Sequence, residues 1–369
     1  MKEEILSNIT IVSILIVVGS FLLVYYLIPK IIFMVNHHNL TEAPIERSSH
    51  VESTPSMGGL SFFVVLILAI FFIKHFDDDN IGLNFVAALT VIFIIGLKDD
   101  LAVSTPRARL LVEILAITIM FFHSGYHVTS FDGFLGFNEA PTLLMDIVHI
   151  IIILTIINAY NLIDGVDGLA STIGITIFTM FGLVFFTLGL NFYFLISLSI
   201  IGILFAYMRY NFSHRKKIFM GDTGSLIIGF CIAILSLKFL TMEASLFTHL
   251  TFKLENKLFI IAGIIAVPLF DMMRVIGVRL IQGKSPFEAD RNHIHHVLIN
   301  LGFAHYKIAM ILGLLNYILA VLIIFLASHT NSFQMMVIFL TIFSLFLAVF
   351  FSLSKRVAKK QTTILNDSK

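Results

Sequence analysis

Two asparagines and two aspartates lie close together in residues 158–168, directly after an apolar run. Asn158, Asn161 and Asp164 have the spacing i, i+3, i+6, which places them near one face for as long as a helix continues. Asp164 and Asp167 are each followed by a glycine, and glycine allows a turn in which the backbone approaches a ligand closely. Carboxylate and amide oxygens suit Mg²⁺, which takes one or two carboxylates and completes its coordination with water and substrate phosphate. This stretch predicts one wall of a metal and phosphate site.

A second pair of carboxylates, Asp99 and Asp100, ends an apolar run and is followed by two cations, Arg107 and Arg109. Adjacent carboxylates repel each other, so they must be solvated or paired. Carboxylates and guanidinium groups on either side of a short loop suit phosphate transfer, because one group handles the proton or the metal while the other holds the anion. A solvated helix end is the alternative interpretation.

The segment Phe219–Ser225 opens a later apolar run and contains Gly221, Asp222 and Thr223. Asp and Thr are ordinary caps at a helix N-terminus, and that is the structural alternative. The segment is denser in small polar residues than a cap requires. A carboxylate flanked by glycines and followed by hydroxyls and free amides predicts a cradle for phosphate and metal.

The long polar loop 285–296 contains Arg291, His293, His295 and His296. Zinc binding is one interpretation, but zinc sites usually include a carboxylate or a cysteine, and the aspartates elsewhere favour a harder metal. The favoured interpretation is a cationic and hydrogen-bonding wall for a pyrophosphate or a sugar. A solvated loop is the structural alternative.

Asp271 and Arg274 lie at i, i+3 inside another apolar run. Charges at membrane depth are costly and usually face the interior of a helix bundle. The two side chains could neutralise each other, or one of them could contact a substrate, and the sequence leaves both interpretations open.

The composition identifies a membrane protein. The chain has 369 residues, of which 58% are hydrophobic, and its mean hydropathy is +0.98, which is more apolar surface than a soluble domain can bury. The net charge of +1 gives no reason to expect a nucleic-acid partner. Cys231, the single cysteine, lies in an apolar run and carries no redox argument.

The apolar runs predict an all-α polytopic protein with about eleven transmembrane helices, since roughly 20 apolar residues cross a bilayer. With the N-terminus outside, most of the 24 lysines and arginines fall on the same side as the motifs. The positive-inside rule therefore predicts an N-out, C-in topology with the motifs on the cytoplasmic face. One transmembrane domain, 1–354, is followed by a basic tail, 355–369. The predicted spans are 9–29, 57–74, 81–97, 108–122, 144–160, 168–188, 192–209, 222–240, 257–277, 306–327 and 333–354.

Five motifs, taken in chain order, resemble those of the polyprenyl-phosphate N-acetylhexosamine-1-phosphate transferases. The resemblance runs from about residue 45 to residue 300. Each motif alone is a weak signal, but five in the right order are specific. They are Thr-Pro-x-Met-Gly-Gly (54–59), Asp-Asp (99–100), Asn-x-x-Asn-x-x-Asp-Gly-x-Asp-Gly (158–168), Gly-Asp-Thr-Gly-Ser (221–225) and Arg-x-His-x-His-His (291–296).

The resemblance implies transfer of an N-acetylhexosamine 1-phosphate from a UDP-sugar to undecaprenyl phosphate, with release of UMP, in the bacterial plasma membrane. The pattern in 291–296 resembles the branch that uses GlcNAc and begins O-antigen, common-antigen or teichoic-acid synthesis. The phospho-MurNAc-pentapeptide branch, which is the alternative, typically has consecutive histidines instead. The family often has lysine where this chain has Arg107 and Arg109, which leaves open which base holds the phosphate. A homodimer is implied only as an alternative to a monomer.

The resemblance also implies roles for the motif residues. Mg²⁺, or Mn²⁺ in its place, would bridge the pyrophosphate oxygens and be held by Asp222 and Asp167. Asp99 or Asp100 would take a proton from the lipid phosphate or assist the metal, and a two-step route through a covalent aspartyl intermediate is the alternative to direct attack. The catalytic group would be Asp99, Asp100, Asp167, His293, His295 and His296, and the substrate-binding group Asn158, Asn161, Asp164, Arg107, Arg109, Arg291, Thr223 and Gly221.

Two other classes of membrane protein share some of these features. A transporter or flippase for a lipid-linked sugar would also have many spans and intramembrane charges, but its polar residues would spread through the depth of the bilayer. A metal channel would use the histidines but leaves the Gly-Asp-Thr-Gly-Ser motif unexplained. Because the polar motifs gather on one predicted face, the sequence favours the enzyme.

Overall fold

The computed structural model describes residues 8–38, 54–102, 104–121, 126, 130–243, 246, 252–283, 285 and 293–367, without the side chains of 358 and 360–367. Within these residues the chain is helical apart from turns and one isolated antiparallel bridge between Ser130 and Glu139. The α-helices are α2 (Ile9–His37), α3 (Gly59–Ile73), α4 (Gly82–Leu101), α5 (Pro106–Phe121), α6 (Thr142–Asn161), α7 (Leu169–Thr187), α8 (Asn191–Asn211), α9 (Gly221–Thr241), α10 (Lys257–Ile264), α11 (Ala266–Ile281), α12 (Ile294–Leu301), α13 (His305–His329) and α14 (Ser332–Asp367).

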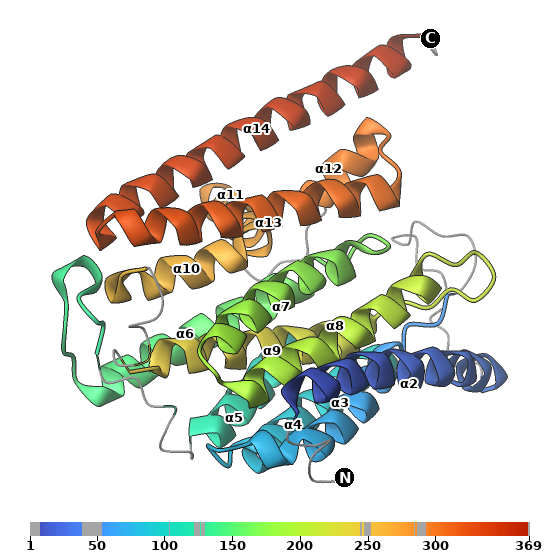
Figure 1. The fold of residues 1–369 in the computed structure, drawn as a ribbon. Helices are drawn as coiled ribbons and strands as arrows, with labels where there is room; N and C mark the ends of the chain where they lie inside the picture. Colours follow the sequence, from blue (N-terminus) through green and yellow to red (C-terminus); the bar gives the residue numbers. More distant parts are fainter. Residues whose placement is uncertain are drawn as a thin grey trace.

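Helix α9 lies inside the bundle, where it packs against α3, α4, α6 and α7 (Figure 1). Of its most apolar 18-residue stretch, 94% is buried, as expected for a helix that is apolar on all sides. By contrast, only 6% of the corresponding stretch of α14 is buried, and α14 lies at the edge of the bundle above α13 (Figure 1). The fold therefore places the start of α9, which carries Asp222, among several other helices.

The prediction of a multi-pass membrane protein is confirmed, while the predicted number of spans is not. Among the described residues, nine helices are long and apolar enough to cross a membrane, or up to ten if a bent pair counts as one span. The difference from eleven arises at α5, which has 16 residues and is short for a span of about 20, and at the predicted span 257–277, which is broken.

The break separates α10 from α11 at Ile265, where the helix direction changes by 80°. Proline has no backbone N–H, and its ring clashes with the carbonyl four residues earlier, so Pro268 leaves the Ile264 carbonyl without a helical partner. Asn316 of α13 is fully buried here. Its amide donates to the Ile264 carbonyl at 2.9 Å, and its side-chain oxygen accepts from the Val267 N–H at 3.0 Å.

The ends of the helices that carry the motifs meet at one end of the bundle. Asp100, at the end of α4, accepts from the backbone of Asp222 at the start of α9, and Asn161, at the end of α6, donates to the Asp222 side chain. The segment before α3 joins them, since the Phe219 N–H donates to the Pro55 carbonyl at 2.7 Å. Which side of the membrane this end faces stays a prediction.

Candidate active site

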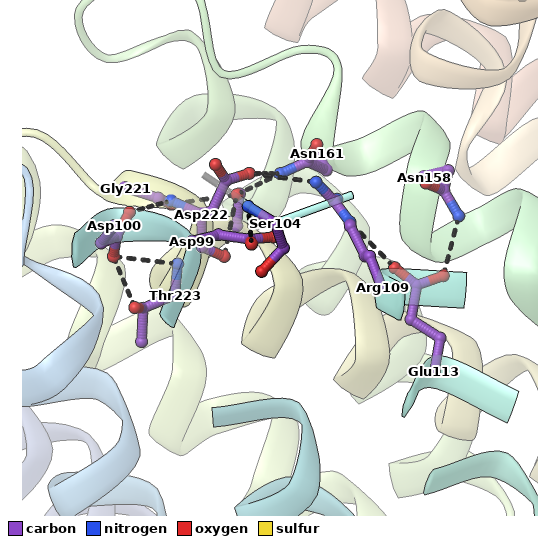
Figure 2. Close-up of polar contacts among 11 residues, drawn as sticks. Asp99, Asp100, Ser104, Arg109, Glu113, Asn158, Asn161, Gly221, Asp222 and Thr223 are labelled. Carbon is purple, nitrogen blue, oxygen red and sulfur yellow. Dashed lines mark hydrogen bonds and ion pairs between the residues drawn. The ribbon is translucent and has the colours of Figure 1, made fainter. Parts of the chain in front are cut away.

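Asp222 lies where α4, α5, α6 and α9 converge. Arg109 Nη1 and Asn161 Nδ2 both donate to its Oδ1, at 3.2 Å and 2.8 Å (Figure 2). The Asn161 amide also donates to Ser225 Oγ at 2.7 Å. The Asp222 side chain is 41% exposed, so this carboxylate remains accessible to a ligand. The structure thus joins three of the predicted motifs at one carboxylate.

Asp100 takes a different position from its sequence neighbour Asp99. It is buried, and it accepts from the N–H groups of Asp222 and Thr223, at 2.7 Å and 3.2 Å, and from the Thr223 hydroxyl. These are N–H groups that a helix N-terminus leaves without intrahelical partners. Asp99 is half-buried and accepts from the Ser104 N–H at 3.1 Å.

The geometry therefore joins Asp100 and Thr223 to each other at the start of α9. We predicted that Asp100 acts in catalysis and that Thr223 contacts a substrate. Thr223 is fully buried and its hydroxyl donates to Asp100, which is itself buried. The two predicted roles stay predictions. Of the two adjacent carboxylates, Asp99 is the more accessible. Arg107 is exposed.

Gly221 is required by its backbone conformation and by its neighbours. Its φ is +72°, a left-handed value that L side chains rarely adopt. A Cβ at this position would lie 2.0 Å from the Ser56 carbonyl oxygen and 2.6 Å from both Asp100 carboxylate oxygens. We predicted Gly221 as a substrate-binding residue; the structure shows that it makes room for Asp100 at the start of α9.

Glu113 is a site residue that the sequence analysis missed. It is 1% exposed, and it accepts from Arg109 Nε at 3.1 Å and from Asn158 Nδ2 at 3.1 Å. Glu113 thereby holds Arg109 in the position from which it contacts Asp222 (Figure 2). Its signal in the sequence is a lone carboxylate four residues after Arg109 in an apolar segment, and such charges usually have a partner.

Replacing Glu113 with Gln is expected to lower the free energy of unfolding by about 1–3 kcal/mol, because the part-buried Arg109 loses one of its two charged partners and keeps only Asp222. Thermal unfolding of the detergent-purified variant measures this as a lower Tm. Glu139→Gln removes the same charge from an exposed residue and is the matched control. A Glu113→Gln variant that melts with the wild type would contradict this role.

Asp164, in the turn after α6, lies near three other carboxylates. It is half-buried. Burial, reinforced by the negative charges of Asp222, Asp100 and Asp167, raises the pKa of Asp164 to about 7. A cation bound beside Asp164 would relieve this repulsion, which makes Asp164 and the accessible Asp222 the donors that fit a divalent metal best.

Asp167 is already paired with two positively charged or hydrogen-bonding side chains. Lys217 Nζ lies 2.7 Å and His305 Nδ1 2.8 Å from its Oδ2. Burial raises the pKa of Asp167, but the hydrogen bonds from His305 and Lys217 outweigh it, so the pKa lies below its ordinary value. The predicted metal role of Asp167 would therefore have to use Oδ1. Lys217 and His305 are further residues that the sequence analysis did not assign to the site.

The histidine segment reaches the turn after α6. A Cβ on Gly165 would lie 2.3 Å from His295 Nε2, so the glycine is needed for the ring to pack against this turn. Burial, reinforced by His296, lowers the pKa of His295 to about 3. His295 is therefore neutral at physiological pH, so it would add hydrogen bonds but no charge to the predicted cationic and hydrogen-bonding wall. Arg291 lies outside the described residues.

No group of three or more His, Cys, Asp or Glu is arranged as a metal cage in the described part of the chain. Mg²⁺ does not require one, because it usually binds to one or two carboxylates together with water and substrate phosphates. Asp222 and Asp164, which repel each other electrostatically, are the carboxylates that would fit such an ion.

Comparisons with known proteins point to one group of enzymes. The family model described as glycosyl transferase family 4 matches residues 82–240, which include α4 to α9. The chain is 31% identical over 309 residues, 82% of its length and 81% of the relative's, to the probable undecaprenyl-phosphate N-acetylglucosaminyl 1-phosphate transferase of Bacillus subtilis (strain 168). It is 28% identical over 320 residues, 83% of its length and 82% of the relative's, to the undecaprenyl-phosphate alpha-N-acetylglucosaminyl 1-phosphate transferase of Escherichia coli (strain K12).

Proposed function

Because the chain belongs to glycosyl transferase family 4, we propose that it transfers N-acetylglucosamine 1-phosphate to undecaprenyl phosphate. The observation that carries the proposal is the accessible Asp222, which lies at the start of a buried helix beside Arg109 and Asn161. Carboxylates and a guanidinium gathered at one end of a membrane bundle suit a reaction between two phosphates. The names of the relatives from Bacillus subtilis and Escherichia coli support the same chemistry.

Several details of the proposal extend beyond this core. The donor is UDP-N-acetylglucosamine, and UMP is the leaving group. The enzyme lies in the bacterial plasma membrane with its N-terminus outside and its site facing the cytoplasm, as the distribution of Lys and Arg favours. Its product begins a cell-envelope polysaccharide. A homodimer stays a prediction.

In the proposed reaction, a lipid phosphate oxygen attacks the β-phosphorus of the UDP-sugar. A new P–O bond forms, the bond between the β-phosphorus and the bridging oxygen breaks, and UMP leaves with that electron pair. A lipid phosphate is largely ionised near neutral pH, so a protein base contributes little. Catalysis then consists mainly of alignment and charge neutralisation.

The chain's own residues supply that alignment. Arg109, held by Glu113, and Lys217, held by Asp167, place positive charge beside the site. Asp99 is the accessible carboxylate of its pair and would take a proton from any protonated lipid phosphate. Asp222 and Asp164 would hold Mg²⁺ or Mn²⁺, which when bound would neutralise negative charge on the pyrophosphate. A covalent aspartyl route is the alternative mechanism.

Release of UMP by the purified protein tests the proposal. The reaction would contain radiolabelled UDP-N-acetylglucosamine, undecaprenyl phosphate and Mg²⁺ in detergent, with one sample lacking the lipid and one containing EDTA. We expect UMP release only when lipid and metal are both present. If UMP were released only from a different UDP-N-acetylhexosamine, that sugar would replace N-acetylglucosamine in the proposal. No release from any donor by folded protein would favour a transporter.

Mg²⁺ binding is expected to weaken about tenfold between pH 8 and pH 6, because a proton competes with the metal at Asp164. The folded-state pKa of Asp164 is about 7, above its ordinary value of 3.8. Folding therefore favours the protonated form, and this contribution to stability is lost as the pH rises through 7. A bound cation favours the charged form, so it stabilises the protein more at high pH.

The increase in Tm on adding Mg²⁺ measures this effect at each pH. We expect a larger increase at pH 8 than at pH 6. In Asp164→Asn the side chain at this position does not titrate between pH 6 and pH 8. The increase in Tm on adding Mg²⁺ should therefore be nearly independent of pH in this variant. A wild-type increase that is equal at both pH values would contradict the assignment of Asp164.

A further inference from the structure

Asp271 lies near the middle of the bent segment α10–α11 and is only 2% exposed. Its carboxylate accepts three hydrogen bonds. Its Oδ1 accepts from Arg274 Nη2 at 2.9 Å and from the Ile294 N–H at 3.0 Å, and its Oδ2 lies 2.8 Å from His293 Nδ1. Of the two interpretations that the sequence left open, the pairing with Arg274 is the one observed, but it is only part of the arrangement. Asp271 also holds His293 and the first residue of α12.

These contacts decide which partner carries the proton between Asp271 and His293. Arg274 is permanently charged, and the Ile294 N–H is a fixed donor, so both stabilise an ionised Asp271 carboxylate. An ionised carboxylate has no proton to donate. His293 Nδ1 must therefore be the donor, which places a proton on Nδ1 and fixes the orientation of the ring.

The same carboxylate positions the rest of the histidine segment. The ring of His293 lies parallel to that of His295, with centroids 5.6 Å apart, and His295 packs against Gly165 in the turn that carries Asp164 and Asp167. Arg274 is itself covered by Phe350 of α14, whose ring centroid lies 3.7 Å from the guanidinium carbon. A continuous series of contacts thus runs from α14 through Asp271 to the site.

We propose that Asp271 is a positioning residue of the transferase, which fixes the Nδ1–H form of His293 and holds the histidine segment against the turn at residues 162–168. This inference rests on the proposed function, and it deepens it by assigning a role to a carboxylate outside the motifs. Carboxylates that orient a histidine in this way are worth about 10–100-fold in activity at metal sites. Asp271 acts through His293 and does not itself contact substrate.

A double-mutant cycle on UMP release separates this role from a general structural one. Asp271→Asn is expected to lower kcat about 10–100-fold and to change the KM for UDP-N-acetylglucosamine less than about threefold. In a His293→Gln background the same substitution should have less than about a threefold further effect, because its partner is gone. If Asp271→Asn lowered kcat by the same factor in the His293→Gln background as in the wild type, the proposal would be overturned. A His293→Gln variant with wild-type activity would also overturn it.

Asp79→Asn is the matched control. Asp79 also accepts charged and neutral hydrogen bonds, from Lys238 Nζ at 2.6 Å and from the Tyr193 hydroxyl at 2.7 Å, but it precedes α4, at the opposite end of the bundle from Asp100. Its replacement should leave kcat near the wild-type value. An equal loss of kcat in Asp79→Asn and Asp271→Asn would overturn the proposal, since the loss of any hydrogen-bonded carboxylate would then suffice.

The protonation of His293 is measured in the wild-type protein, which keeps the proposal testable if Asp271→Asn does not fold. Nitrogen NMR of ¹⁵N-histidine-labelled protein, with the signal assigned by its loss in His293→Gln, should show a proton on Nδ1. An unprotonated Nδ1 would overturn the proposal. A protonated Nδ1 in a wild-type protein that releases no UMP would instead count against the proposed function.

Discussion

Replacing Asp222 with Asn is expected to reduce UMP release about 1000-fold or more, equivalent to about 4 kcal/mol of transition-state stabilisation. Asp222 is an accessible carboxylate at the start of α9, in contact with both Arg109 and Asn161. An asparagine preserves its shape but removes the charge that would attract a divalent cation. It also removes one of the two ionic partners of Arg109 and leaves Glu113 as the other.

The same variant should lose the Mg²⁺-dependent increase in Tm, which separates metal binding from later steps. Asp78→Asn is the control, because Asp78 is an exposed carboxylate in the turn between α3 and α4. We expect Asp78→Asn to retain wild-type activity. An Asp222→Asn variant with more than about a tenth of wild-type activity would exclude Asp222 as the main metal ligand.

Replacing Gly221 with Ala is expected to lower the free energy of unfolding by about 2–5 kcal/mol and UMP release by more than about 100-fold. A left-handed backbone costs an alanine roughly 1–2 kcal/mol, and overpacking typically adds about 1–3 kcal/mol. The added methyl group would collide with the Ser56 carbonyl and with both carboxylate oxygens of Asp100. Either the turn or Asp100 must move, and both movements displace Asp222.

Thermal unfolding and the UMP assay on the same preparation measure the two effects. Gly19→Ala is the matched control, since a Cβ at Gly19 of α2 would meet no atom within 4 Å. That variant should resemble the wild type in both measurements. If Gly221→Ala were as stable and active as Gly19→Ala, the close contact between Asp100 and the start of α9 would not be required.

The two adjacent carboxylates Asp99 and Asp100 show how the fold divides similar residues between roles. Consecutive residues of a helix point about 100° apart, so one of them faces the interior at this position. Asp100 is buried against the N-terminus of α9, while Asp99 remains half-buried. Asp100 accepts from two N–H groups of α9, whereas Asp99 accepts from the Ser104 N–H of the following loop.

The class of protein could be predicted from the sequence, and so could the gathering of three motifs at helix ends. Span-length apolar runs depend only on local hydropathy, which is why a multi-pass all-α protein could be predicted. The motifs at 99–100, 158–168 and 221–225 are also local, and their common location at helix ends follows from where the apolar runs stop. The structure confirms that the described parts of these motifs lie together.

The tertiary structure alone decided which of these residues pair with one another. Asp222 and Arg109 are separated by 113 positions, and Asp167 and His305 by 138, so no spacing rule joins them. Pro268 signals a helix break locally, but Asn316, which satisfies the broken backbone, lies on another helix. A buried polar group must find a partner, yet the identity of that partner depends on how the helices pack, which local sequence does not encode.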